Sequence, residues 1–266
     1  MTKSEGEAVS QGPATIAFEQ PLNERVRMFL RLEFLFAEFR HHRADSSAWG
    51  LRASLHALLD LLSLLGRSDL KTEIIKELGD QQSALTRLKQ KPGVDPGRLD
   101  QVLGEILAAI NAMQRLTTHA IATALRDNEF LMTLANRSTV PGGTAGFDLP
   151  HFHAWLALPA AQQHRDLDAW FADLAPFEQC VNLYLKLLRN SVEPTPQVAR
   201  GGMFVYTPQA QYALVRVLLP ADSALYPEIS AGRHRFTVRM MQLRDVNVRA
   251  HQATQDVSFQ LQCCLL

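Results

Sequence analysis

The sequence predicts an α+β protein in which an N-terminal helical bundle domain is followed by an antiparallel β domain. Two observations support this fold class. Apolar residues recur with helical spacing from residue 22 to about residue 191, and beyond residue 203 the apolar period falls to two. Helices therefore precede strands instead of alternating with them, which argues against a parallel βαβ sheet. A short β-like segment before the helices, ATIAFE, cannot be stable alone and is expected to join the C-terminal sheet.

The elements of the N-terminal part follow from caps, breakers and apolar spacing. Residues 1–13 are small and polar and are expected to form a disordered tail, and 14–20 form the N-terminal strand. Gly66 is expected to close the second helix, Ser68 to cap the third, and Asp95–Pro96 to open the fourth. The predicted helices are 22–42, 51–65, 69–91, 96–113, 117–125, 127–137, 150–157, 160–174 and 176–191. The Pro- and Gly-containing stretch 140–150 is expected to be a loop.

The C-terminal part is predicted to be a β domain. Residues 193–202, EPTPQVARGG, contain two prolines and two glycines and are interpreted as a linker. Strands are expected at 203–206, 212–219, 235–243 and 256–264. The predicted organisation is thus a tail (1–13), a strand (14–20), a helical domain (21–192), a linker (193–202) and a β domain (203–266).

Composition excludes several classes of protein. Lys plus Arg and Asp plus Glu each number 27, so the formal charge is zero, which argues against a general nucleic-acid coat protein. The N-terminus has no apolar segment typical of a signal peptide, and no apolar run reaches the roughly 18 residues of a membrane span. Three cysteines are too few for a disulfide framework and favour a cytoplasmic location. Neither nucleic acid nor a membrane is expected as a partner.

The neutral total hides a basic C-terminal part. From Arg200 to Leu266 there are seven arginines, no lysine and four acidic residues, a net charge of +3. Arginine is suited to gripping carboxylates in a fixed geometry. On composition alone, however, the simpler interpretation that these arginines lie on a solvated sheet face is preferred.

Most motifs with possible chemistry are weak. The stretch Gly142–Gly146 lacks the lysine of a phosphate-binding loop, and a structural turn is favoured. His151 and His153 would point apart on a helix and have no metal-ligand spacing. Cys263 and Cys264 are expected to pack on opposite faces of a strand rather than form a redox pair. No catalytic residue, metal or cofactor is therefore predicted, although a small-molecule enzyme using the 140–153 loop and its histidines remains the alternative.

The pattern RFTVRMMQL, residues 235–243, is more informative. On a strand, Arg235, Thr237 and Arg239 share one face, opposite the apolar Phe236 and its even-numbered neighbours. Four residues at the rise of a strand place the two arginines roughly 13 Å apart. Such a pair can grip an extended acidic peptide at two points, whereas the simpler explanation is again a solvated face. Arg67, after the second helix, complements the helix dipole or contributes to binding.

Several long blocks of the chain resemble the ZapD family of FtsZ-associated cell-division proteins. They are FEQPLNERVRMFLRLEFL (18–35), GRSDLKTEIIKEL (66–78), PGVD (92–95), VPGGTAGFDLPHFHAWL (140–156) and LYPEISAGRHRF (225–236), together with Arg239 and the Cys263–Cys264 pair. The resemblance runs from Phe18 to Cys264. The longer N-terminal tail and Leu265–Leu266 depart from it, and residues 114–130 align poorly.

The resemblance implies a non-enzymatic cell-division protein, located in the cytoplasm at the mid-cell division site. It implies a homodimer that binds the C-terminal tail of FtsZ, the tubulin-like division GTPase, and crosslinks FtsZ protofilaments in the Z-ring. The positions that match the family's basic tail-binding residues are Arg67, Arg235 and Arg239, with Arg31 and His153 as weaker candidates. The sequence itself adds one expectation: apolar pairs such as Leu58–Leu59 and Leu61–Leu62 favour dimerisation through the helical region.

Overall fold

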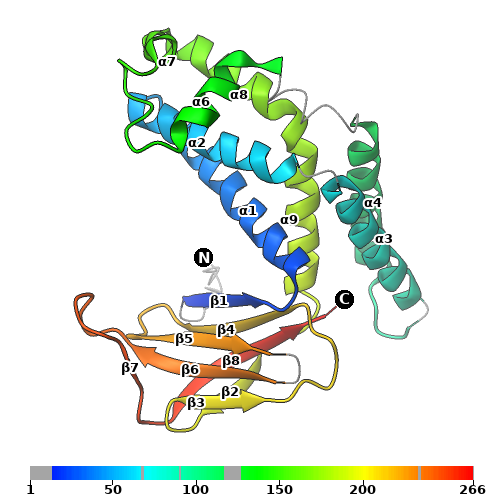
Figure 1. The fold of residues 1–266 in the computed structure, drawn as a ribbon. Helices are drawn as coiled ribbons and strands as arrows, with labels where there is room; N and C mark the ends of the chain where they lie inside the picture. Colours follow the sequence, from blue (N-terminus) through cyan, green and yellow to red (C-terminus); the bar gives the residue numbers. More distant parts are fainter. Residues whose placement is uncertain (1–13, 67–68, 90, 117–126, 233–234, 266) are drawn as a thin grey trace, which may run out of the picture. The chain divides into compact units, whose positions relative to one another are not determined.

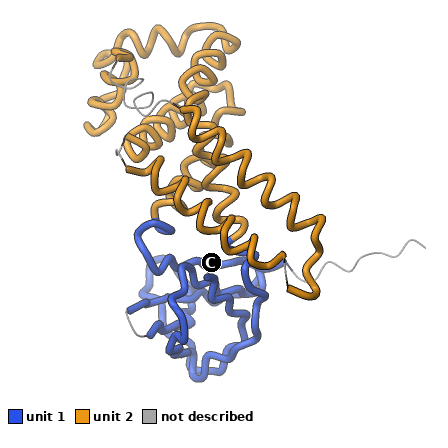
Figure 2. Tube along the Cα trace, turned by 90° about the vertical axis from the view of Figure 1, so that its right-hand side faces the viewer, with its two compact units in different colours: residues 1–27, 188–266 blue, residues 28–187 orange. Residues whose placement is uncertain are grey.

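Both ends of the chain build one β-rich unit, and the middle of the chain builds a helical unit (Figures 1 and 2). The computed structural model describes residues 14–66, 69–89, 91–116, 127–232 and 235–265. Unit 1 comprises residues 1–27 and 188–266, and unit 2 comprises residues 28–187. The predicted α+β class is confirmed, and so is the joining of an N-terminal strand to the C-terminal sheet. The predicted tail, 1–13, lies outside the described residues.

The described helices follow the predicted order. They are α1 (Glu24–Arg43), α2 (Ala48–Leu65), α3 (Leu70–Leu88), α4 (Pro96–Arg115), α6 (Glu129–Ser138), α7 (Pro150–Leu156), α8 (Ala160–Phe171), the single 3-10 turn Ala172–Leu174 and α9 (Ala175–Arg189). The predicted helix at 117–125 falls on residues that the structure does not describe. Residues 140–149 form consecutive turns, as expected for a loop.

Side-chain caps account for several of the helix starts. The Asp95 carboxylate accepts hydrogen bonds from the backbone N–H groups of Gly97 and Arg98, with Pro96 at the first helical position of α4, as predicted. Gly66 lies at the C-cap of α2, also as predicted. The prediction of Ser68 as the cap of α3 is wrong, because Asp69 holds the N-cap position and α3 begins at Leu70.

The leucines of α2 lie in the core of unit 2. Leu58, Leu59, Leu61 and Leu62 are each at most 6% exposed within this single chain. Helices on more than one side of α2 therefore cover the apolar positions that suggested a dimer surface. Their burial within the protomer removes the sequence argument for dimerisation through these leucines.

One described helix has the length and composition of a membrane span. In α2, 18 residues have a mean hydropathy of 1.2, and 56% of them are buried inside the protein. Arg52 and Asp60 interrupt its apolar surface. This degree of burial is typical of the central helix of a bundle, which is apolar on more than one side.

The β unit contains two antiparallel sheets. Sheet A has the order β1-β4-β8-β2, formed by β1 (Thr15–Pro21), β4 (Leu214–Pro220), β8 (Val257–Cys264) and β2 (Thr195–Ala199). Sheet B has the order β3-β6-β5, formed by β3 (Met203–Tyr206), β6 (Phe236–Gln242) and β5 (Leu225–Ala231), and the short β7 (His251–Gln252) pairs with β6. Strands β3, β4, β6 and β8 match the predicted strands.

The interpretation of residues 193–202 as a linker is wrong for half of that segment. Strand β2 pairs with β8 from Thr195 to Ala199, and Ala199 is fully buried. Pro196 would disrupt a central strand, but β2 is an edge strand of sheet A, where a missing N–H is tolerated. Strand β5 was missed for the same reason, because it contains Pro227 and is an edge strand of sheet B.

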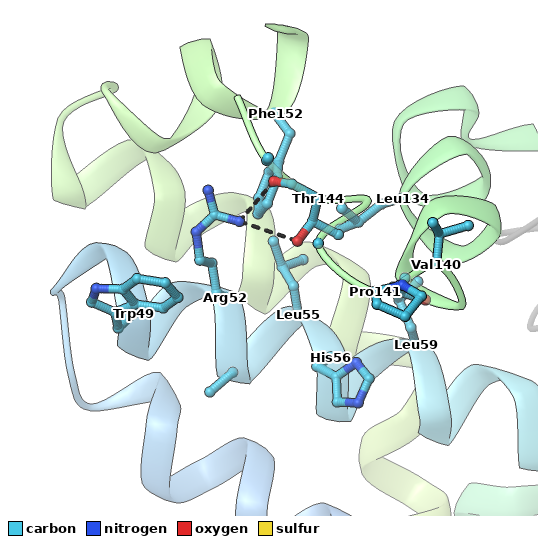
Figure 3. Close-up of a pocket in the computed structure, with 14 residues that line it drawn as sticks. Trp49, Arg52, Leu55, His56, Leu59, Leu134, Val140, Pro141, Thr144 and Phe152 are labelled. Atoms are coloured by element: carbon cyan, nitrogen blue, oxygen red, sulfur yellow. Dashed lines mark hydrogen bonds between the residues drawn. The ribbon is translucent and has the colours of Figure 1, made fainter. Parts of the chain in front are cut away.

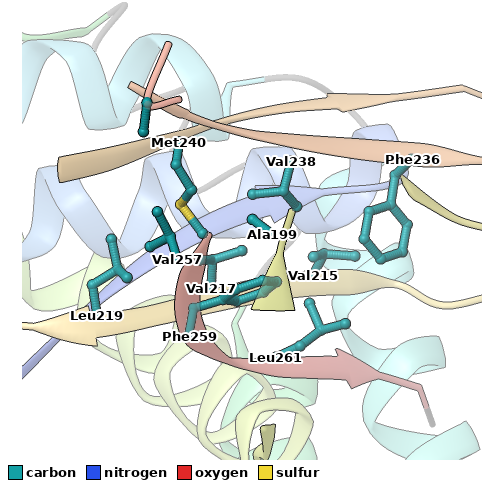
Figure 4. Close-up of a cluster of buried hydrophobic side chains, with 11 residues drawn as sticks. Ala199, Val215, Val217, Leu219, Phe236, Val238, Met240, Val257, Phe259 and Leu261 are labelled. Atoms are coloured by element: carbon teal, nitrogen blue, oxygen red, sulfur yellow. The ribbon is translucent and has the colours of Figure 1, made fainter. Parts of the chain in front are cut away.

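The two sheets enclose a shared apolar core (Figure 4). Sheet A contributes Val215, Val217, Leu219, Val257, Phe259 and Leu261, and sheet B contributes Phe236, Val238 and Met240. The connection from β2 to β3 passes through Gly202, whose φ is +73° and whose added Cβ would collide with the Ala253 carbonyl oxygen. Only glycine fits this close approach, because a side chain would collide with backbone.

An ion-pair cluster attaches β1 to the rest of unit 1. Glu19 accepts two hydrogen bonds from Arg189, both 2.8 Å long, and one from Arg216 at 2.7 Å. Arg216 also donates to Gln262, and Gln262 donates to the Val192 carbonyl. Glu19, Arg216 and Gln262 lie opposite one another on neighbouring strands. The cluster therefore joins three strands of sheet A to the segment that follows α9.

Candidate functional site

The candidate site is the face of sheet B that points away from the core, here called the outer face of sheet B. Phe236, Val238 and Met240 of β6 point into the core, so Thr237, Arg239 and Met241 point outward, as predicted from strand parity. Neighbouring strands place further residues on this face through their register. Opposite Arg239 lie Met203 on β3 and Glu228 on β5, and opposite Thr237 lie Val205 and Ser230.

Apolar and charged side chains are adjacent on this face. Met203 is 46% exposed and Val205 is 48% exposed. Both side chains lie on the strand directly beside the outward-facing residues of β6, and neighbouring strands are about 4.8 Å apart. The face therefore offers apolar contact area next to an arginine. This combination suits an extended peptide that has both apolar and acidic residues.

Arg239 forms an ion pair that the sequence did not reveal. Its Nη2 donates to Glu228 Oε2 at 2.8 Å, across the β5–β6 pair. Both side chains are about half exposed, and ion pairs of this kind typically contribute only about 0–1 kcal/mol. The bond uses one N–H group, and a guanidinium has several, so Arg239 retains donors for a second carboxylate. Glu228 also reduces the positive charge of the site.

Glu228, Met203 and Val205 were missed as site residues. Met203 and Val205 lie in a strand that was predicted, but the pairing partner of that strand is not readable from sequence. Glu228 lies in β5, which was not predicted as a strand because it contains Pro227. A partial signal was present, since tyrosine, isoleucine and alternation in LYPEISA are typical of a strand.

Arg235 lies one residue before β6 and is exposed. Its backbone carbonyl accepts a hydrogen bond from the Gly232 N–H at 2.9 Å, which closes the turn between β5 and β6. Residues 233 and 234 of that turn are outside the described part of the chain. Arg235 has the same parity along the chain as Arg239, but it lies outside the paired residues of β6, so its place on the outer face of sheet B stays a prediction.

The other candidate residues lie elsewhere in the chain. Arg67 is outside the described residues. Arg31 is exposed on α1, and His153 is exposed on α7, so both belong to unit 2 rather than to unit 1 with Arg235 and Arg239. The His153 ring lies 3.2 Å from where a Cβ on Gly146 would be. Within the described ranges, no hydrogen bond or ion pair joins the Arg31 and His153 side chains to each other.

The loop at 140–150 borders a pocket in unit 2, but not through its neighbouring histidines. The pocket has a volume of about 600 Å³ and is lined by α2, α6, the loop and α7. His56 lines it, whereas His151 and His153 do not. The His151 ring instead packs edge-on against Phe130, with ring centroids 5.5 Å apart. This geometry gives no support to an enzyme that uses His151 and His153.

The three cysteines are free thiols that are buried or partly buried. Burial raises the pKa of the Cys263 thiol and of the Cys264 thiol, each to about 11, which disfavours the reactive thiolate. Burial likewise raises the pKa of Cys180 to about 12. In the ranges that the structure describes, no three His, Cys, Asp or Glu side chains are grouped to hold a metal ion.

Comparison with known proteins identifies the family. The model of the family described as "ZapD: Cell division protein" matches residues 30–239. A protein named "Cell division protein ZapD" from Methylococcus capsulatus is 37% identical over 255 residues, covering 94% of this chain and 98% of that protein. Relatives of the same name from Azoarcus and Photobacterium profundum are 34% and 36% identical, covering 94% and 85% of this chain and 100% and 91% of those proteins. The chain belongs to the ZapD family of cell division proteins.

Proposed function

We propose that this protein binds the C-terminal tail of FtsZ on the outer face of sheet B and, as a homodimer, crosslinks FtsZ protofilaments in the Z-ring. In this proposal it acts in the cytoplasm at the mid-cell division site and has no enzymatic activity. Arg235 and Arg239 hold carboxylates of the tail, and Arg67 adds a third positive charge. Arg31 and His153 are weaker candidates for the same role.

The observation that carries the proposal is the combination of Arg239, Met203 and Val205 on one exposed sheet face. The two apolar side chains are close to half exposed and can contact apolar residues of an extended tail. Arg239 can hold a carboxylate through donors that Glu228 does not use.

Crosslinking requires two tail sites in one particle, which a dimer supplies. A filament displays many tails, so weak single contacts gain strength through effective concentration. The buried leucines of α2 do not provide the dimer surface. Exposed apolar side chains of unit 2, such as Phe34, Leu107 and Phe147, are the described residues available for it.

The proposal is tested with a fluorescent peptide of the FtsZ C-terminal tail and with FtsZ filament pelleting. The Arg235→Glu/Arg239→Glu double variant should lose tail binding and filament bundling. Each lost charge-assisted contact costs about 2 kcal/mol, and every 1.4 kcal/mol is about tenfold in affinity, so two losses correspond to roughly 1000-fold.

A charge-matched control uses Arg115 and Arg249, which are both exposed. The Arg115→Glu/Arg249→Glu variant changes the net charge by the same amount and should bind the tail nearly as well as the wild type. Equal tail binding by the wild type and the Arg235→Glu/Arg239→Glu variant, with unchanged circular dichroism, would place the site elsewhere. Arg31 and His153 would then be the next residues to replace.

A further inference from the structure

The pocket of unit 2 has features of a ligand-binding site that the proposed function does not use (Figure 3). Its volume of about 600 Å³ lies within the range of about 300–1,000 Å³ typical of ligand pockets. Its walls are mostly apolar side chains, contributed by Leu55, Leu59, Leu134, Val140, Pro141 and Phe152. Three helices and the 140–145 turn hold these walls, so the pocket is built on structured elements.

Arg52 supplies a positioned positive charge at this pocket. Its Nη1 donates to the Thr144 carbonyl oxygen at 2.9 Å, and its guanidinium lies over the Phe152 ring at 4.7 Å. These contacts fix the plane of the guanidinium. Figure 3 shows the other guanidinium nitrogens pointing away from Thr144. Across the described part of the chain, no hydrogen bond occupies Nη2 or Nε, and the pocket lining includes neither Asp nor Glu.

Trp49 extends the site at its rim. Its large, mostly apolar side chain is 79% exposed. It lies about one helical turn before Arg52 on α2. The Arg52 guanidinium is 5.6 Å from the centre of its ring. Exposed tryptophan and arginine side chains beside a pocket are typical of the residues that carry binding energy at protein interfaces.

We propose that this pocket binds a peptide segment in which a carboxylate lies next to an aliphatic or aromatic side chain. The apolar side chain enters the pocket between Leu59, Leu134 and Phe152, and the carboxylate binds the open edge of the Arg52 guanidinium. Charge complementarity supports this occupant, because the lining carries an unneutralised cation and no anion. The proposal rests on the pocket and is independent of tail binding on sheet B.

The experiment selects phage-displayed random 12-residue peptides on the full-length wild-type protein. Enriched peptides are resynthesised with a fluorescent label, and their affinities are measured by anisotropy. We expect a class of peptides with Asp or Glu beside an aromatic or aliphatic residue. These peptides should bind Arg52→Gln at least tenfold more weakly than wild type, and replacing their acidic residue with its amide should cause a similar loss.

Controls separate this pocket from the sheet face and from misfolding. Arg98→Gln removes an exposed arginine of the same unit and should leave binding unchanged. The same peptides should bind the Arg235→Glu/Arg239→Glu variant normally, even if tail binding proves to lie elsewhere. Ala53→Phe fills the pocket while keeping Arg52 and should also weaken binding at least tenfold. Failure to enrich acidic peptides that still bind the Arg235→Glu/Arg239→Glu variant, or undiminished binding of those peptides to both Arg52→Gln and Ala53→Phe, would overturn the proposal.

Discussion

Replacing Glu19 with glutamine isolates the contribution of the ion pairs that attach β1 to the rest of unit 1. The Glu19 side chain is 18% exposed and accepts three hydrogen bonds from Arg189 and Arg216. Glutamine keeps the shape and one acceptor oxygen but has no charge, and its amide NH₂ faces an arginine. The substitution therefore weakens three charge-assisted bonds without opening a cavity.

The expected cost follows from this geometry. Breaking a fully buried ion pair costs about 3–5 kcal/mol, whereas exposed pairs contribute about 0–1 kcal/mol. The Glu19 cluster is mostly but not fully buried, and Arg216 keeps its bond to Gln262, so we expect about 2 kcal/mol at pH 7. For a unit of roughly 100 residues, this lowers the melting temperature by about 10 °C.

The effect should depend on pH in a defined direction. Burial alone would raise the pKa of Glu19, but hydrogen bonds and positive charge from Arg189 and Arg216 outweigh it and hold the pKa below its usual 4.5. A carboxylate whose folded pKa lies below its unfolded pKa stabilises the fold above the unfolded pKa. That contribution is lost as the pH falls through the folded value. The difference between wild type and Glu19→Gln should therefore shrink below pH 4.5.

The assay must report on the unfolding of unit 1. Tryptophan fluorescence does not, because all three tryptophans, Trp49, Trp155 and Trp170, lie in unit 2. Hydrogen exchange of the β1 and β4 amides, followed by mass spectrometry, meets this need. Glu24→Gln is the matched control, since Glu24 pairs with Arg27 in an exposed helical turn and should cost about 0.5 kcal/mol or less. A Glu19→Gln effect no larger than that of Glu24→Gln, or one that does not diminish in acid, would refute the reasoning.

Three further predictions concern unit 1 and its outer sheet face. Deleting residues 14–20 should lower the melting temperature of unit 1, because β4 loses its partner over the whole length of β1; unchanged exchange protection of β4 would contradict this. Gly202→Ala should destabilise unit 1 by about 2 kcal/mol or more in urea denaturation, since its Cβ meets backbone at a positive φ, and a change below 0.5 kcal/mol would count against the close approach. Glu228→Gln should tighten FtsZ-tail binding a few-fold and less so at high salt, because it removes a carboxylate that competes for Arg239; weaker binding would mean that Glu228 positions Arg239 instead.

Local signals in the sequence were sufficient for most of the elements. The cap at Asp95, the closing glycine at Gly66 and the alternation around Val238 each depend on residues close in the chain. The same alternation correctly predicted that Arg239 points away from the core. Edge strands were harder to predict, because Pro196 and Pro227 are breakers in a central strand but are tolerated at an edge.

The composition of the site depended on long-range pairing. Whether Arg239 faces Glu228, and whether Met203 lies beside it, is decided by register between strands that sequence does not specify. The α2 leucines show the same problem for helices. Leu58 and Leu61 give adjoining faces of α2 an apolar surface that must be covered. The sequence does not tell whether another helix of this chain or a second copy of the protein covers it, whereas the structure shows that both leucines are buried within this chain.

The pairing of β1 with β4 has a consequence for synthesis on the ribosome. Thr15 pairs with Pro220, so β1 is made roughly 200 residues before its partner strand. At about 5–20 residues per second, translation of that interval takes about 10–40 s. Residues 28–187 are complete in the meantime and have their own core, so the helical unit can fold as an insertion while the first strand waits unpaired. Translation pauses between residues 188 and 220 would lengthen that wait, during which the nascent strand is open to chaperones and to pairing with other chains.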